Sequence, residues 1–183
     1  ASLEQAGIQG CVVNARHVKQ VPGRKSDVQD SEWLAELGPC GLLRSSFIPP
    51  RDLRELRLLT RYRRKLGGVL AGEKNRLHKV LDDAGIRLGC VVSDIDGVSA
   101  RAMVEALIRG GSTPEQIAEQ ALGRLQKKKD ALQLALEGEI SDRHRFVLQK
   151  ILGHVKWLQR QMALIDGQIV AAMKPYREEW KLV

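Results

Sequence analysis

The chain has few aromatic residues, because Phe, Tyr and Trp make up only 4% of its 183 residues. Compact enzyme domains usually build part of their core from these large side chains. Here Leu, Ala, Lys, Arg, Glu and Gln dominate instead, a composition that is typical of long helices. We therefore expect a mainly α-helical protein.

Cysteines and long apolar runs are also scarce. The three cysteines, Cys11, Cys40 and Cys90, are odd in number and lack metal-site spacing, which favours a reducing, cytoplasmic setting. No apolar run approaches the roughly 18 residues of a membrane span, and no charged-then-apolar leader opens the chain. We expect a cytoplasmic protein with no membrane partner.

The start of the chain has no initiator Met, and residues 1–7 are typical of a helix end that stops at Gly7. Residues 8–13 are apolar and rich in β-branched side chains, which predicts a strand. A single strand without a partner is not stable. We therefore interpret residues 1–48 as a piece of a larger α/β domain.

Two aspartates, Asp27 and Asp30, open the next predicted element. Ser26 with Gln29 forms a capping-box pattern, which predicts a helix from Asp27 to about Leu37. Residues i and i+3 share one face of a helix, so both carboxylates have room to share a hard cation such as Mg²⁺. The competing interpretation is that these acids only complement the helix macrodipole.

Residues 51–79 carry most of the charge of the chain. This segment has ten Lys or Arg residues against three acids, a net +7 of the total +8. A helix face that is only solvated usually mixes both signs, so this segregation favours contact with phosphates. The predicted nucleic-acid-binding residues are Arg54, Arg57, Arg61, Arg63, Arg64, Lys65, Arg76 and Lys79, together with Arg24 and Lys25 from the preceding basic turn.

The same segment has a helical register over residues 51–84. Apolar residues follow one a/d pattern that is interrupted by Arg63 and Glu73. Glycines inside a helix weaken it, and those here indicate either a bend or the close approach of another backbone. These glycines are Gly67, Gly68 and Gly72.

Residues 85–140 have weaker patterns. Ser99 predicts one helix N-cap, and Thr113 predicts another because Pro and Gln follow it at suitable positions. We expect the second helix to continue through the cluster of lysines at residues 127–129. Asp94 and Asp96 are interpreted as turn formers and not as metal ligands.

The last long segment has the clearest helical pattern, from a cap at Ser141 to a stop before Pro175. Its apolar seam needs a partner, either residues 51–84 or a second copy of the chain. Arg63 and Glu73 interrupt the apolar register of residues 51–84, so this helix would cover the seam imperfectly. We therefore expect a homodimer through the helical arm. His144 and His154 are interpreted as ordinary surface or seam residues. The seam consists of Leu148, Ile151, Val155, Leu158, Met162, Ile165, Ile169 and Ala172.

Ordered motifs along the chain resemble those of one transposase family. They include residues 22–30, PGRKSDVQD, residues 47–50, FIPP, and residues 60–63, TRYR, with further matches at residues 91–94 and 144–146. The family is that of the DEDD insertion-sequence transposases, recombinases guided by a bridge RNA. The resemblance runs over essentially the whole chain.

The resemblance implies a fold and a set of active-site residues. Residues 1–48 would be the C-terminal remnant of an RNase H-like (RuvC-like) domain, and residues 49–183 a helical coiled-coil arm. Asp27 and Asp30 match the last two acids of the family's catalytic tetrad, which holds Mg²⁺. The first two acids are expected before residue 1 and a serine-nucleophile domain after Val183, so this segment alone is expected to be inactive.

The implied function is cleavage and joining of DNA strands, by which a bacterial mobile element is inserted and excised. DNA and a guide RNA are the implied partners. The alternative, from the residues alone, is a non-catalytic nucleic-acid-binding module that dimerises through a coiled coil.

Overall fold

A computed structural model describes residues 5–8, 10–14 and 27–180, with the side chains of residues 31–178 in the last range. The chain forms two compact units, residues 1–54 and residues 55–183. The described parts are mainly helical, which confirms the fold class expected from the composition. None of the helices in these parts is long and apolar enough to cross a membrane. The interpretation of residues 1–48 and 49–183 as domains stays a prediction.

The first unit contains the predicted Asp helix. Helix α3 (Asp27–Leu37) has the expected bounds, and its last residue, Leu37, is buried. The chain turns at once, because the Gly38 N–H donates to the Leu34 carbonyl (3.1 Å) and Gly41 adopts a positive φ of 67°. Gly tolerates this left-handed conformation without a steric penalty.

The strand predicted for residues 8–13 is wrong for the described part of that segment. Among its described residues only an isolated antiparallel bridge forms, between Val13 and Ser45. The Ser46 N–H donates to the Val12 carbonyl (2.7 Å), and Cys11 Sγ lies 2.9 Å from Ser45 Oγ. One bridged pair does not make a stable sheet. The RNase H-like remnant therefore stays a prediction.

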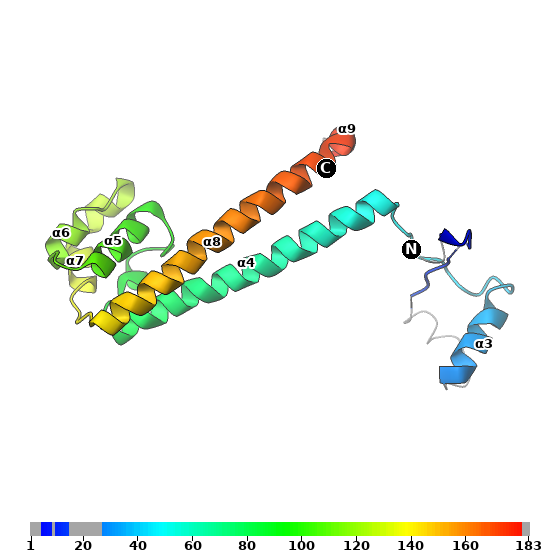
Figure 1. The fold of residues 1–183 in the computed structure, drawn as a ribbon, viewed down its shortest axis with the longest axis horizontal. Coiled ribbons are helices and arrows are strands. Elements are labelled where there is room, and N and C mark those ends of the chain that lie inside the picture. Colours follow the sequence, from blue (N-terminus) through cyan, green and yellow to red (C-terminus); the bar gives the residue numbers. More distant parts are fainter. Residues whose placement is uncertain (1–4, 9, 15–26, 181–183) are drawn as a thin grey trace. The chain divides into compact units, whose positions relative to one another are not determined.

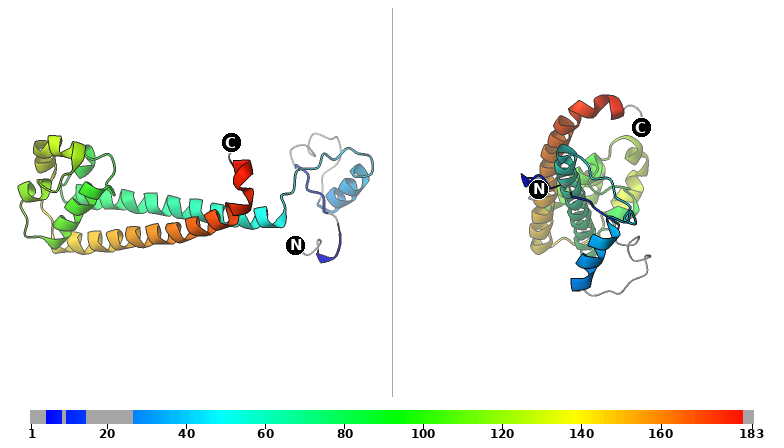
Figure 2. Two further views of the ribbon diagram at one scale, coloured as in Figure 1. Left: turned by 90° about the horizontal axis from the view of Figure 1, so that it is seen from above. Right: turned by 90° about the vertical axis from the view of Figure 1, so that its right-hand side faces the viewer.

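The second unit is built on a helical hairpin. Helix α4 (Arg51–Asp83) and helix α8 (Asp142–Met173) lie side by side in both Figure 1 and Figure 2. They are antiparallel, since residues late in α8 pair with residues early in α4. The pairs are Arg63 with Asp166, Glu73 with His154, and Asp83 with His144.

The start of α8 confirms the predicted cap. The Ser141 hydroxyl accepts from the His144 N–H (3.3 Å), and the His144 ring nitrogen Nδ1 lies 3.2 Å from the Ser141 backbone nitrogen. These contacts satisfy N–H groups that the first helical turn leaves unpaired. After α8, Pro175 lies in a short 3₁₀ turn, η3 (Lys174–Tyr176), and helix α9 (Arg177–Trp180) follows.

A group of short helices joins α4 to α8 at one end of the hairpin (Figure 1). After the 3₁₀ turn η1 (Leu88–Cys90) come helices α5 (Val98–Arg109), α6 (Pro114–Ala118) and α7 (Lys129–Ala135). Between α6 and α7 lies the 3₁₀ segment η2 (Gly123–Lys128).

Two predictions in this region are corrected. Thr113 does cap α6 through a capping box with Gln116, but α6 ends at Ala118 and does not run through the lysines. Ser99 is not an N-cap, because α5 begins one residue earlier behind Gly97. Ser99 is buried instead, and its hydroxyl accepts from the Leu122 N–H (3.0 Å).

The core of this unit is aliphatic and lies where the hairpin ends meet the short helices. Burial of each Leu, Ile, Val or Met side chain contributes about 1.5–3 kcal/mol to folding. The largest fully buried side chains are Leu77, Leu81, Ile86, Leu88, Met103, Leu132, Leu148 and Leu158.

The α8 seam is covered mostly from within the chain. Leu148, Ile151, Val155 and Leu158 are buried, whereas the seam residues from Met162 to Ile169 are half-buried and Ala172 is exposed. The residues that interrupt the α4 register, Arg63 and Glu73, have polar partners on α8. Cover by α4 is therefore complete over the inner half of the seam and incomplete over the outer half, near Arg63. Dimerisation stays a prediction for the outer half of the arm.

Candidate nucleic-acid interface

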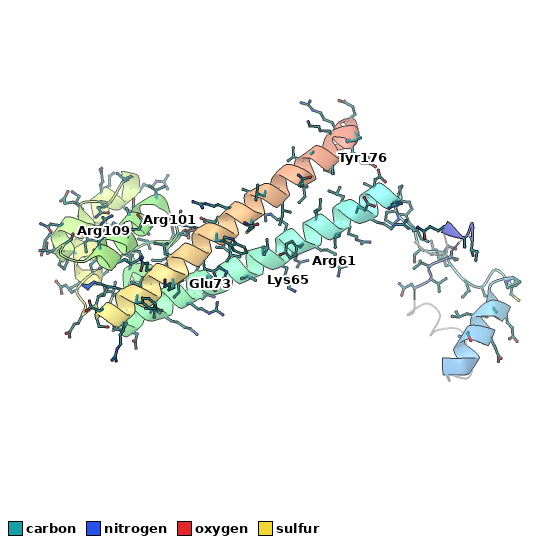
Figure 3. The ribbon with its side chains drawn as sticks, in the orientation of Figure 1. Arg61, Lys65, Glu73, Arg101, Arg109 and Tyr176 are labelled. Atoms are coloured by element: carbon teal, nitrogen blue, oxygen red, sulfur yellow. The ribbon has the colours of Figure 1, made fainter. Side chains whose placement is uncertain are left out.

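One exposed face of α4 carries the unpaired positive charge of that helix. At 100° per residue, these cations lie opposite the residues of α4 that are buried, such as Leu66, Leu77 and Leu81. Each has no ion-pair partner among the residues that the structure describes. We call this surface the basic face of α4, and Figure 3 labels two of its members, Arg61 and Lys65. It consists of Arg57, Arg61, Arg64, Lys65 and Lys79.

Two of the predicted nucleic-acid-binding residues are engaged elsewhere. Arg63 makes a two-pronged contact with Asp166 on α8, Nε to Oδ1 at 2.9 Å and Nη2 to Oδ2 at 3.2 Å. This hydrogen bonding, with the charge of Asp166, raises the pKa of Arg63. Arg76 Nη1 donates to Glu73 Oε1 at 2.5 Å. Their charges are thus partly neutralised within the chain, so they are weaker candidates than the basic face of α4.

Arg54 and two residues of the preceding basic turn complete the predicted set. Arg54 lies half-buried in the first turn of α4 and interacts with other residues of the chain. Arg24 and Lys25 lie outside the described residues. All three stay predictions.

The predicted metal ligands lie on α3. Asp27 and Asp30 occupy its first turn, one i, i+3 step apart, as expected, and their side chains are outside the described atoms. Their oxygen donors suit a hard cation such as Mg²⁺. In the described part of the chain, no cluster of three or more His, Cys, Asp or Glu residues is placed to hold a metal ion.

The glycines of α4 have no packing role against the described part of the chain. The helix continues through Gly67, Gly68 and Gly72 without a break. A Cβ atom added at any of them would meet nothing within 4 Å. By helical spacing, Gly68 and Gly72 lie on the basic face of α4, so two positions of that face between Lys65 and Lys79 carry no side chain.

The histidines predicted as ordinary surface or seam residues take part in the pairing of α4 with α8. His144 Nε2 lies 3.0 Å from Asp83 Oδ2, and His154 Nδ1 lies 3.0 Å from Glu73 Oε1. Glu73 is a buried charged residue, only 7% exposed. A buried carboxylate without a partner is costly, so His154 and Arg76 together allow it to lie between the helices.

A polar junction fixes α4 and α5 to the loop before α5. Lys74 on α4 contacts Asp94 (3.1 Å) and Asp96 (3.3 Å), and Arg101 on α5, labelled in Figure 3, contacts Asp96 as well. The Asp96 N–H donates to Asp94 Oδ1 (3.0 Å), which confirms the turn-forming role predicted for Asp94. These acids therefore serve the fold.

Sequence reasoning missed a second positive surface, on α8. Residues 143–165 contain five Lys or Arg residues and no acid. The net charge of residues 80–183 is only +1 because the short helices and the ends of the segment carry the compensating acids. Counting charge helix by helix would have revealed the surface. Among its exposed cations are Arg143, Lys150 and Arg160.

Comparison with known proteins identifies a family over the first part of the chain. Residues 1–86 match the model of the DEDD family described as transposase. Neither the curated proteins nor the solved structures contain a match to the chain. The matched stretch includes the whole of α3 and α4, hence Asp27, Asp30 and the basic face of α4. The predicted resemblance is thus confirmed for residues 1–86, which are similar to the DEDD transposases, a family of DNA-binding, DNA-processing enzymes, and beyond residue 86 it stays a prediction.

Proposed function

We propose that this chain is part of a transposase that acts as a site-specific DNA recombinase. It would cleave and join DNA strands so that a mobile element is inserted and excised. The family match over residues 1–86 supports this proposal, together with the i, i+3 aspartates on α3.

In this proposal, Asp27 and Asp30 supply two of the carboxylates that bind Mg²⁺. A bound Mg²⁺ would position and polarise a phosphodiester and reduce the charge cost of the attacking oxygen. Mg²⁺ keeps several waters when a protein offers only one or two carboxylates. We therefore assign the two aspartates a shared role with further acids of the recombinase.

The basic face of α4 is proposed to bind the phosphates of DNA or of a guide RNA. Arg57 and Lys79 are 22 residues apart, which corresponds to about 33 Å along a helix. Duplex DNA carries about one negative charge per 1.7 Å of axis, so several phosphates fall within this length. The observation that carries the proposal is that these cations have no acidic partner in the described part of the chain.

Salt dependence of binding tests the role of this face. We expect the triple variant Arg61→Gln, Arg64→Gln and Lys65→Gln to weaken binding to duplex DNA. The slope of log affinity against log salt should fall by up to about 0.9 for each phosphate that the variant no longer neutralises. The matched control is the charge-neutral pair Arg63→Gln with Asp166→Asn, which removes a paired cation and should leave the slope unchanged. An unaltered slope in the triple variant would mean that the face is merely solvated.

A recombination assay tests the role of the aspartates in the intact recombinase. Asp27→Asn and Asp30→Asn should each abolish strand cleavage while the helical circular dichroism signal stays the same. Glu36→Gln is the matched control, since Glu36 is an exposed acid on the same helix. Full activity in both aspartate variants would favour the alternative, a non-catalytic nucleic-acid-binding module.

A further inference from the structure

The outer face of α8 presents two of the few aromatic residues of the chain to solvent. Trp157 is 52% exposed and Phe146 is 60% exposed, although the core of this unit is aliphatic. Large aromatic side chains normally contribute to folding through burial. The position of these two therefore indicates a role in binding.

Helical geometry places both aromatic residues on one side of α8. Phe146, Lys150 and Trp157 are spaced by four and seven residues, so they share a face. This face lies opposite the buried seam residues Leu148 and Val155. The two aromatic positions are eleven residues apart, about 16 Å along the helix axis.

The Trp157 ring is held in place by His154, which is itself held by Glu73. The buried carboxylate of Glu73, labelled in Figure 3, holds His154 Nδ1 at 3.0 Å across the two helices. The His154 ring lies against Trp157, with ring centroids 5.9 Å apart and an interplanar angle of 32°. The indole is thus preorganised, which reduces the entropy lost when a ligand stacks on it.

The charge around these rings fits a polyanion. Residues 143–165 contain no acid, the exposed Asp142 one turn before Phe146 lies 3.9 Å from Arg145 Nη1, and Lys150 Nζ lies 4.9 Å from the centroid of the Phe146 ring. Arg160 is exposed and has no ion-pair partner in the part of the chain that the structure describes. A second copy of the chain would bring the same positive face against this one, and like charges disfavour such an interface.

We propose that the outer face of α8 around Trp157 is a stacking site for unpaired nucleotides of a bound nucleic acid. Every base has a π-face that can stack on an aromatic side chain, and nearby cations hold the backbone. Paired bases inside a duplex are already stacked, so the site selects single-stranded segments. This inference rests on the proposed nucleic-acid-binding function and names the form of nucleic acid that α8 recognises.

Affinity measurements on the full chain test the proposal with a 20-nucleotide oligo(dT) strand and a 20-base-pair duplex as probes. Trp157→Ala should weaken single-strand binding about 5- to 150-fold, the range of one lost base stack, with duplex binding unchanged. Trp157→Phe should retain most of the affinity. Leu164→Ala is the matched control, because Leu164 is 66% exposed on the same face but offers no ring.

Fluorescence provides an independent readout. With Trp33 and Trp180 replaced by Phe, Trp157 is the only tryptophan, and oligo(dT) should quench its emission while the duplex should not. The proposal would be overturned if Trp157→Ala lost affinity for both probes equally, or for neither. It would also be overturned if sedimentation revealed self-association through this face.

The α4 triple variant separates the two proposals. If it weakens binding of both probes while Trp157→Ala has no effect, the nucleic-acid-binding function holds and only the stacking site fails. If neither variant changes the affinity, both proposals fail.

Discussion

At the scale of single residues, the contact between Lys74 and Asp94 responds to pH. The Asp96 N–H and the Lys74 ammonium both donate to Asp94, and together they lower the pKa of this carboxyl. Burial lowers the pKa of Lys74, but hydrogen bonds with Asp94 and Asp96 outweigh it and leave the pKa raised. Both shifts mean that the charged forms are favoured in the folded protein.

We predict that Asp94→Asn lowers the free energy of unfolding near pH 7 by less than about 1 kcal/mol, because the Asp94 side chain is largely exposed. A carboxyl whose pKa is depressed in the folded protein stabilises the fold at pH values above its ordinary pKa of 3.8. This contribution to stability is lost as the pH falls through the pKa of the folded state. The wild type and the variant should therefore converge below pH 3.8 in urea titrations.

Asp82→Asn is the control for this experiment, since the Asp82 carboxylate has no ion-pair partner among the described residues. A gap between wild type and Asp94→Asn that stays constant from pH 7 to pH 3 would contradict the assignment. Lys74 does not contribute to the change in stability between pH 3 and pH 7, because its raised pKa lies far above this range.

Local residue patterns were predictable where the partner is near in sequence. Thr113 and Ser141 act as caps as expected, because each needs only a residue three positions ahead. The pair of Glu73 with His154 was not predictable, since 81 residues separate its members. No spacing rule links them until α4 and α8 fold together.

At the scale of elements, the glycines of α4 weaken a helix that nevertheless forms. We predict that Gly68→Ala raises the free energy of unfolding by about 0.5–1 kcal/mol, because Ala restricts the unfolded chain and has better helix propensity. The added methyl group points into open space. Urea unfolding followed by circular dichroism measures the change.

Gly138→Ala is the contrasting variant and should destabilise the protein. An added Cβ would lie 2.4 Å from the Ala84 carbonyl oxygen, a backbone atom that cannot turn away. The next residue holds the two segments together, because the Glu139 N–H donates to the Ala84 carbonyl oxygen (2.9 Å). A destabilised Gly68→Ala, or an unaffected Gly138→Ala, would show that this account of the glycines is incorrect.

The elements with long, regular patterns were those that the sequence predicted best. The helices at Asp27–Leu37, Arg51–Asp83 and Asp142–Met173 have nearly the expected bounds. The break after Ala118 was missed, because it depends on tertiary contacts. One is the hydrogen bond from Leu122 to buried Ser99, and another is the ion pair of Lys129 with Glu119 (2.6 Å).

At the scale of the whole molecule, the hairpin changes how dimerisation can be tested. Leu158 is only 1% exposed within a single chain. Replacing it by Asp would bury an unpaired charge and disrupt the hairpin whether or not a dimer exists. Met162, Ile165 and Ile169 are half-buried, so the apolar surface left for a second copy lies on the outer half of α8.

We predict a homodimer that uses this outer half of the arm. Ile165→Asp with Ile169→Asp should dissociate it, because these half-buried positions still contact water in a single chain and the new charges would lose that remaining contact when two copies pair. Sedimentation at micromolar concentration would then detect a monomer. The thermal unfolding midpoint should change much less than in Leu158→Asp, whose side chain lies in the buried part of the seam. An unmodified chain that already sediments as a monomer would contradict the prediction, because α4 alone would then be a sufficient partner for the seam.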